Sequence, residues 1–317
     1  MVNFWKDKNI VITGASGFLG THLCNQLGKL EANIFSMSSA QYDLRYQSQV
    51  ESMFDSFIFV QPRPIVFNLA ANVGGIGYNQ NHPYRLFTDN AQITLNMIDA
   101  ATRYNIEKFI QIGTVCAYPK FAKPPFREEM LWDGYPEETN APYGLAKKLG
   151  LVQLQAARQE LNFNGIYLLQ SNLYGPGDNF ANYRSHVIPA LIKRSLAAKK
   201  NNEAKITVWG TGEATRDFLY IDDAVNGIIS AAEKYNSSEP LNLGSGQEIR
   251  IAVLVYMINQ LVDYRGDIEY DQTKPDGQPR RGLNVDKAKY ILGWKAKIQL
   301  REGLRRTIEW YKKEVGI

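Results

Sequence analysis

The sequence predicts an α/β fold in which a doubly wound parallel sheet is joined to a second, smaller mixed α/β domain. Short apolar runs alternate with amphipathic stretches as far as Leu173, and the first run ends in a glycine-rich turn. Such an alternation of strands and helices is typical of parallel sheets that are covered by helices on both faces.

Each element of the first domain has its own pattern. Residues 9–13 are a short apolar run, which indicates a buried parallel strand, and the helical spacing of apolar residues over 84–104 indicates an amphipathic helix. The predicted order is strand 9–13, helix 18–29, strand 33–37, strand 64–69, helix 84–104, strand 108–112, helix 143–159 and strand 165–169.

The length of the chain predicts more than one core. A single hydrophobic core rarely serves a chain of 317 residues, so one large and one smaller domain are expected. The turn-rich stretch 174–178 marks a boundary. We therefore expect a sheet domain over residues 1–173, to which a segment at about 216–240 returns, and a second domain over 174–317.

Composition and charge exclude several classes of function. The chain is 44% hydrophobic and 21% charged, as ordered globular proteins are. Its net charge of +4 is mild, and its basic residues are scattered in pairs such as Arg280-Arg281, so no nucleic-acid partner is expected. Two cysteines and three histidines without metal-ligand spacing predict no metal site.

The apolar stretches bear on the cell compartment. The N-terminal residues contain no signal-peptide stretch, and no run approaches the roughly 20 apolar residues that span a bilayer. We therefore expect a cytoplasmic, reduced protein with no membrane partner.

A glycine loop lies between the first strand and the first helix. Glycine permits a tight turn and lets backbone amides approach a pyrophosphate, while the helix N-terminus favours negative charge. In this strand–turn–helix context the loop predicts dinucleotide binding by a Rossmann-type domain. The predicted contacts are Gly14, Ala15, Ser16, Gly17, Phe18, Leu19 and Gly20.

The residues after the second strand bear on the choice of cofactor. NAD-binding chains commonly carry an acid there that binds the ribose 2′-hydroxyl, and the stretch 34–40 has none. Ser38 and Ser39 are suited to donate to a 2′-phosphate, although no arginine stands beside them and an ordinary polar turn is the alternative. NADP is favoured and NAD is not excluded. Asp43 is a candidate for binding the adenine amino group, or else a turn residue.

Tyr143 and Lys147 are the candidates for proton transfer in a redox reaction. Residues four apart on a helix share a face, so the two side chains are expected to be neighbours. A nearby ammonium stabilises a phenolate and lowers a tyrosine pKa, which suits proton transfer near neutral pH. Thr114, just after the strand at 108–112, is placed to hydrogen-bond the same substrate oxygen.

With the glycine loop, Thr114, Tyr143 and Lys147 in this order, the chain resembles the extended short-chain dehydrogenases/reductases. The resemblance implies that Tyr143 exchanges a proton with a carbonyl or hydroxyl. It implies that Lys147 holds the nicotinamide ribose and the tyrosine, and that Thr114 orients the substrate. Further cofactor contacts are expected from Ile112, Gly113, Asn172, Leu173 and His186.

Further motifs over nearly the whole chain resemble the GDP-L-fucose synthase family. The resemblance implies conversion of GDP-4-keto-6-deoxy-D-mannose to GDP-L-fucose, by epimerisation at C3 and C5 followed by NADPH-dependent reduction at C4. The first domain would then bind the cofactor and the second the nucleotide sugar. The motifs are 72–76, 116–120, 138–143, 172–180, 185–191, 208–212, 216–218 and 274–280.

The same resemblance implies that Cys116 and His186 are the acid–base pair of the epimerisation. A 4-keto group acidifies the protons at C3 and C5, so one group can remove a proton while another returns one on the opposite face. Thiols and imidazoles have reference pKa values of about 8.5 and 6.5, close enough to neutrality for this work. Taken singly, Cys116 is expected to be a small buried residue and His186 a satisfied loop histidine.

Substrate contacts and assembly follow from the resemblance in the same way. Arg194 and Arg216 would pair with phosphates or hydroxyls, Trp209 would contact the base or sugar, and Asp276 would accept hydrogen bonds. Core packing for the tryptophan and surface ion pairs for the arginines are the alternatives. A homodimer is also implied, with its contact formed by helices near 84–104 and 143–160.

Three departures from the family pattern keep alternatives open. Ala15 and Ser16 stand where the family usually has an arginine, serines replace a second arginine after the second strand, and Thr114 replaces a serine. A redox-neutral nucleotide-sugar epimerase that resembles GDP-mannose 3,5-epimerase ranks second, because that family lacks the context of His186. A non-catalytic nucleotide-binding relative ranks third, because Tyr143, Lys147 and the glycine loop are all present.

Overall fold

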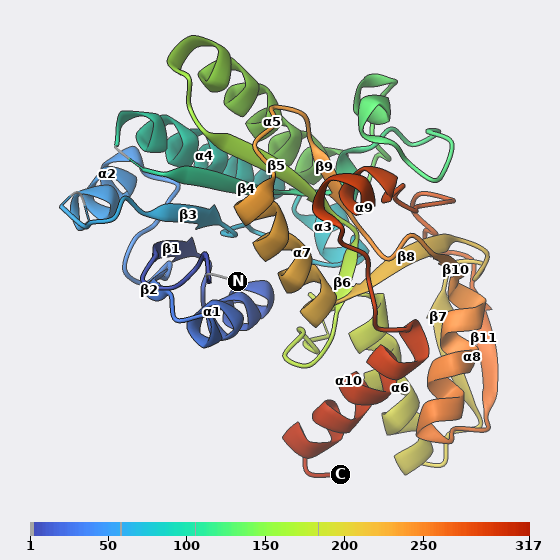
Figure 1. Ribbon diagram of the computed structural model, residues 1–317. Coiled ribbons are helices and arrows are strands. Elements are labelled where there is room, and N and C mark those ends of the chain that lie inside the picture. Colours follow the sequence, from blue (N-terminus) through green and yellow to red (C-terminus); the bar gives the residue numbers. More distant parts are fainter. Residues whose placement is uncertain (1–2, 58, 105, 183) are drawn as a thin grey trace.

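The main sheet has six strands in the order β2-β1-β3-β4-β5-β9, and each pair of neighbours is parallel (Figure 1). A computed structural model describes residues 3–317 except 58, 105 and 183. The sheet confirms the predicted doubly wound α/β fold. Its strands are β1 Asn9–Thr13, β2 Asn33–Met37, β3 Ile65–Asn68, β4 Lys108–Thr114, β5 Gly165–Gln170 and β9 Leu241–Leu243.

Strand β1 shows how the sequence builds a sheet with two buried faces. Ile10 and Ile12 belong to a core cluster that includes residues of the helices on one face, whereas Val11 belongs to a second cluster that includes residues of the helices on the other face. Successive side chains of a strand point to opposite faces, so a strand covered on both sides must be continuously apolar. The helices are α1 Phe18–Lys29 and α7 Ile221–Lys234 on the first face, and α2 Gln47–Asp55, α4 Pro83–Arg103 and α5 Ala141–Leu161 on the second (Figure 1).

The predicted elements of the first part are present, with small changes at their ends. The helix predicted over 143–159 begins earlier, at Ala141, because Pro142 fits the first helical turn. Two helices were not predicted: α2, and α3 at Ile76–Asn81, which begins directly after Gly74 and Gly75. Glycines suggest a loop, yet here they precede a helix that buries Tyr78.

The chain after β5 builds two smaller sheets with their own helices, which gather at the lower right of Figure 1. One sheet has the order β10-β8-β6, and the other pairs β11 with β7. The bounds are β6 Asn172–Tyr174, α6 Val187–Lys200, β7 Lys205–Trp209, β8 Thr215–Tyr220, β10 Glu248–Arg250, α8 Ile251–Val262, β11 Asp267–Asp271, α9 Asp286–Leu292 and α10 Leu300–Glu314, with 3₁₀ turns η1 Val115–Ala117 and η2 Glu128–Trp132.

Two late elements lie on the main sheet. Helix α7 packs against α1, and β9 pairs with β5 as the sixth strand. The two parts of the molecule are therefore interleaved in sequence. In the described part of the chain, no helix has the length and apolar character needed to cross a membrane, and no cluster of three or more His, Cys, Asp or Glu could hold a metal ion.

Candidate active site

A cavity of about 1130 Å³ lies at the carboxyl ends of the main-sheet strands. In open α/β sheets this edge is where ligands bind, because the loops that follow parallel strands converge there. Ala15 does not lie on its wall: the side chain is 7% exposed and the backbone oxygen accepts a hydrogen bond from the Thr21 hydroxyl. The wall includes the other predicted residues, namely Gly14, Ser16, Gly17, Phe18, Leu19, Gly20, Ser39, Asp43, Ile112, Gly113, Thr114, Cys116, Tyr143, Lys147, Asn172, Leu173, His186, Arg194, Trp209, Arg216 and Asp276.

The glycine loop forms a cradle that only glycine permits. Gly14 has a φ of +67°, and a Cβ there would lie 3.0 Å from the Ala70 backbone nitrogen. A Cβ on Gly20 would collide with the Gly14 carbonyl oxygen. Helix α1 begins at Phe18, and no side chain caps its N-terminus. The free amides of the first turn and the helix dipole make this end of the cavity suited to a pyrophosphate.

An arginine that sequence reasoning missed reaches the adenosine end of the cavity. Ser38 donates to Gln41, and Tyr42 closes a turn onto Ser38, so the chain folds back and brings Arg45 to the same wall as Ser39. The Arg45 guanidinium binds Asp43 at 2.6 Å and holds the pKa of that carboxyl below its usual value. Arg45 lies six residues after Ser39 in the sequence, so the pattern after the second strand did not indicate that the two share a wall.

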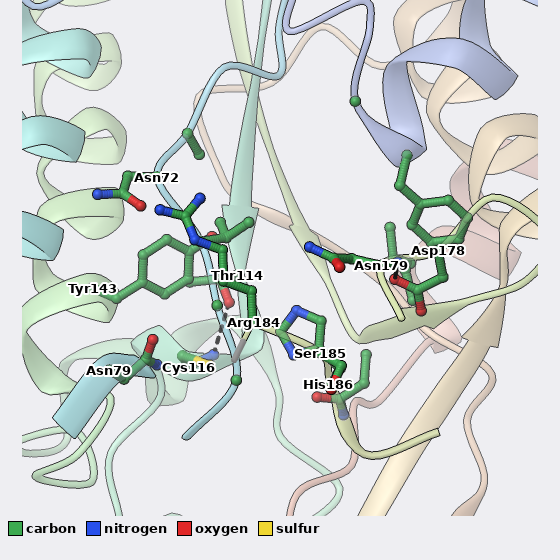
Figure 2. Close-up of a pocket in the computed structure, with 18 of the residues that line it drawn as sticks. Asn72, Asn79, Thr114, Cys116, Tyr143, Asp178, Asn179, Arg184, Ser185 and His186 are labelled. Atoms are coloured by element: carbon green, nitrogen blue, oxygen red, sulfur yellow. Dashed lines mark hydrogen bonds between the residues drawn. The ribbon is translucent and has the colours of Figure 1, made fainter. Parts of the chain in front are cut away.

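Thr114, Tyr143 and Lys147 line the cavity, and Figure 2 shows Thr114 and Tyr143 near each other. Burial lowers the pKa of Lys147 to about 8. Burial, followed by the neighbouring Cys116, raises the pKa of Tyr143 above its ordinary value. The tyrosine pKa expected from sequence was a lowered one, and that expectation was wrong for this structure because burial raises the pKa.

The start of α5 brings Tyr143 close to Cys116. A Cβ on Gly144 would collide with the Cys116 carbonyl oxygen, so glycine is what allows the helix to lie on the η1 turn. Thr114 fixes that turn, because its hydroxyl accepts a hydrogen bond from the Cys116 backbone amide at 3.2 Å (Figure 2). The candidate redox residues and the candidate thiol are thus parts of one packed unit.

The Cys116 sulfur has two polar neighbours. Arg281 donates to it from Nη1 at 3.4 Å, and the thiol donates to the Asn140 Oδ1 at 3.8 Å. Asn140 is itself fixed, since it donates to Glu137 at 2.5 Å and accepts from Asn79 at 3.1 Å.

His186 reaches the cavity from the segment that precedes α6, on a different element from Cys116 (Figure 2). The Gly75 amide donates to the Arg184 oxygen at 3.2 Å, and a Cβ on Gly75 would collide with the Ser185 oxygen. The His186 side chain is exposed toward the open cleft, yet the surrounding protein and then the charge of Arg281 lower its pKa. The structure therefore brings both members of the predicted acid–base pair to one cavity.

The four predicted substrate residues lie on the wall of the same cavity and come from α6, β7, β8 and the loop at 275–281. Arg216 donates to the backbone oxygens of Thr215, Asp276 and Gln278, and burial followed by Arg281 lowers its pKa to about 9. The Asp276 carboxylate accepts from the Thr211 amide and hydroxyl, both at 2.8 Å.

Trp209 and Arg194 complete that wall. Trp209 is 44% exposed, with the Lys274 ammonium 5.6 Å from its ring centroid. Arg194 donates to the Thr207 carbonyl oxygen, and burial lowers its pKa.

Two further wall residues escaped sequence reasoning. Asp178 is 8% exposed, its Oδ2 has no hydrogen-bond partner, and burial raises its pKa to about 7. Arg281 belongs to the basic pair Arg280-Arg281, and charged residues in such pairs usually lie at the surface. Only Arg280 is there, bound to Glu248 at 2.9 Å, whereas Arg281 is 6% exposed. No pattern in the sequence indicates which of the two arginines is buried.

A phosphate cradle beside a threonine, a tyrosine and a lysine in one cavity defines a nicotinamide-dependent short-chain dehydrogenase/reductase. Residues 10–244 match the model of the NAD dependent epimerase/dehydratase family, and the chain belongs to that family. The probable GDP-L-fucose synthase 1 of Oryza sativa subsp. japonica is 38% identical over 99% of this chain and 95% of the rice protein. Within the wider family, the chain thus belongs to the GDP-L-fucose synthases.

Solved structures of two sugar reductases are similar over almost the whole chain. A GDP-6-OMe-4-keto-L-xylo-heptose reductase from C. jejuni shares 26% identity, with a TM-score of 0.89 and coverage of 99% of both chains. MlghC, a GDP-mannoheptose C4 reductase from Campylobacter jejuni with NADP bound, shares 26% identity, with a TM-score of 0.86 and coverage of 97% of this chain and 99% of that one.

The glycine cradle predicts a specific loss of cofactor binding. In Gly20→Ala the new methyl group displaces the loop from the Gly14 oxygen, so the Kd for NADPH should rise about tenfold or more. Fluorescence titration measures this. Gly28→Ala is the matched control, because on the same helix its Cβ meets only the Ile34 Cδ1 at an ordinary 3.8 Å. Equal Kd values for NADPH in the two variants would contradict the role of the glycine loop in binding the cofactor.

The lowered pKa of Lys147 predicts how the rate of the redox step falls at alkaline pH. Tyr143 keeps its proton to high pH, so the first group to titrate as pH rises is Lys147, near pH 8. Above that pH the lysine is neutral and no longer assists proton release by the phenol. Single-turnover NADPH oxidation should therefore fall as pH rises through about 8, and Lys147→Met should remove this pH dependence while slowing turnover about 10²–10⁴-fold. If the rate of Lys147→Met still falls as pH rises through about 8, another group is responsible for that pH dependence.

Proposed function

We propose that this chain is an NADPH-dependent epimerase/reductase that converts GDP-4-keto-6-deoxy-D-mannose to GDP-L-fucose. The observation that carries the proposal is that one cavity is lined by two sets of residues whose chemistry suits proton transfer. One set is Thr114, Tyr143 and Lys147, and the other is Cys116 and His186. Membership of the GDP-L-fucose synthase family and the likeness to reductases of GDP-linked sugars support it.

The epimerisation needs an acid and a base on opposite faces of the sugar. Removal of a proton from C3 or C5 breaks the C–H bond and sends its electron pair to the C4 oxygen. Return of a proton to the other face inverts that carbon. Cys116 lies in the turn after β4 and His186 lies ahead of α6, so the two groups approach the cavity from different elements.

The reduction uses the other set. Bound NADPH would supply the hydride for C4. Tyr143 is the proton donor for the C4 oxygen, since its raised pKa keeps the phenol protonated until it is needed. The Thr114 hydroxyl accepts from the Cys116 amide, which leaves its own hydrogen to donate to the same substrate oxygen. The buried Lys147 amine lies one helical turn from Tyr143 and assists the release of its proton.

The residues present fit the cofactor. The cradle from Gly14 to Gly20 has the free amides and the close backbone approach that a pyrophosphate requires. Ser39 and Arg45 lie on the wall where a 2′-phosphate would be recognised, and the relative with NADP bound supports this choice. We assign the 2′-phosphate to these two residues, with the Asp43–Arg45 ion pair beside them.

The nucleotide sugar occupies the remaining part of the cavity in this proposal. Trp209 offers an exposed ring face for the base or the sugar, and Arg194 and Arg216 supply positive charge toward the diphosphate. Because catalysis needs the Cys116 sulfur reduced, we place the enzyme in the cytoplasm, where thiols are kept reduced.

Turnover of the proposed substrate tests the function. Purified enzyme with GDP-4-keto-6-deoxymannose and NADPH should oxidise one NADPH for each GDP-L-fucose formed. In D₂O the product should carry solvent deuterium at C3 and C5. Epimerised sugar without NADPH oxidation would favour the redox-neutral epimerase, and reduction without deuterium uptake would refute the epimerase half.

We also propose that α4 and α5 form the contact of a homodimer. The two helices pack side by side on one face of the sheet and expose apolar side chains, among them Phe87, Leu95 and Val152 at 43%, 41% and 50%. A joint apolar surface of this kind is typical of an interface between subunits.

Charge on that surface should separate the subunits. The double variant Leu95→Glu, Val152→Glu should have half the mass of the wild-type assembly by light scattering, because apposed carboxylates repel and lose solvation. Val253→Glu, at a 37% exposed position on α8, is the control and should leave the mass unchanged. A dimer that persists in the double variant rules out this face.

A further inference from the structure

Arg281 is fixed against the segment that carries Cys116. Its Nη1 donates to the Cys116 sulfur at 3.4 Å, and its Nε donates to the Gln278 Oε1 at 3.1 Å. Gln278 is 1% exposed and donates to the backbone oxygens of Pro119 and Lys120 at 3.0 and 3.3 Å. The guanidinium is therefore held by the same stretch of chain whose sulfur it contacts.

We propose that Arg281 is a positioning residue that holds the Cys116 sulfur as a thiolate aimed into the cavity, ready to take a proton from the sugar. This inference rests on the proposed function and assigns a cause to its first step. A thiolate accepts a stronger hydrogen bond from a guanidinium than a thiol does, and arginine stays charged under all working conditions.

The other described groups around the sulfur do not combine a positive charge with a hydrogen bond to it. Among the described residues that hydrogen-bond the sulfur, Asn140 is neutral and accepts from the thiol through its Oδ1, whereas Arg281 is charged and donates to the sulfur. Tyr143 lies near the sulfur and keeps its proton. The charge of Arg216 also acts on the sulfur, but its guanidinium donates to the backbone oxygens of Thr215, Asp276 and Gln278. The Glu137 carboxylate is bound by Thr139 and Asn140.

The same cation also acts on His186, whose pKa is lowered first by desolvation from the surrounding protein and then by Arg281. A positive charge favours the anionic sulfur and makes the imidazolium a stronger acid. In the epimerisation the S–H bond forms as the C–H bond breaks, and the electron pair moves to the C4 oxygen. The imidazolium then gives its proton to the opposite face. Arg281 therefore serves the epimerisation rather than the hydride step.

Alkylation of Cys116 tests this role without any substrate. The rate of modification by iodoacetamide is followed against pH by mass mapping of the Cys116 peptide, with the Cys24 peptide as internal reference. In Arg281→Gln the midpoint of the Cys116 profile should move up by about one pH unit, which corresponds to a tenfold loss of thiolate at a given pH below it. Arg281→Lys keeps the charge and should stay close to the wild-type midpoint.

Two further variants keep the test decisive. Arg281→Met replaces the glutamine variant if that one fails to fold, and Arg280→Gln is the control, because Arg280 binds only Glu248 at the surface. An unmoved midpoint in a folded neutral variant, or an equal shift in Arg281→Lys, overturns the proposal. Because the assay needs no sugar, it stands even if the turnover experiment with GDP-4-keto-6-deoxymannose fails.

Discussion

Close approach of backbone to backbone at three glycines is the constraint on which the whole site depends. Gly20 lets α1 start against the Gly14 turn, Gly144 lets α5 lie on the turn of Cys116, and Gly75 lets the segment of His186 pack against the loop after β3. In each case a single Cβ would collide with a carbonyl oxygen. The cofactor cradle, the redox helix and the acid–base pair are therefore placed by the absence of side chains.

Burial then tunes the groups that these approaches bring together. It lowers the pKa of Lys147 and of Arg216 and raises that of Tyr143. Cations gathered in a partly closed cavity suit a substrate with a diphosphate, and they also stabilise the negative charge that develops on a C4 oxygen. Arg281 would add the same kind of stabilisation to a negative charge on the sulfur. The positive charges that line the cavity would then favour both the epimerisation and the reduction.

Much of the fold and site followed from the sequence because the signals were local. Three such signals are the apolar run at β1, the glycine loop and the spacing of Tyr143 and Lys147. Each of them spans only a few residues. Arg281 and Arg45 were missed because their roles arise from chain reversal and long-range packing, which leave no local pattern. Ala15 stays a predicted cofactor contact, and it is buried beside the cavity wall. A contiguous motif does not show which of its residues turn inward.

The central claim is that two proton-transfer sets act independently in one cavity. Exchange of the C3 and C5 hydrogens of GDP-4-keto-6-deoxymannose with D₂O, measured by mass spectrometry on the Tyr143→Phe variant, tests it most directly. Exchange should stay within about threefold of wild type while NADPH oxidation falls at least about 10²-fold, because only the phenol proton has been removed. Loss of exchange together with oxidation, in a variant that still binds NADPH, would contradict the division of labour.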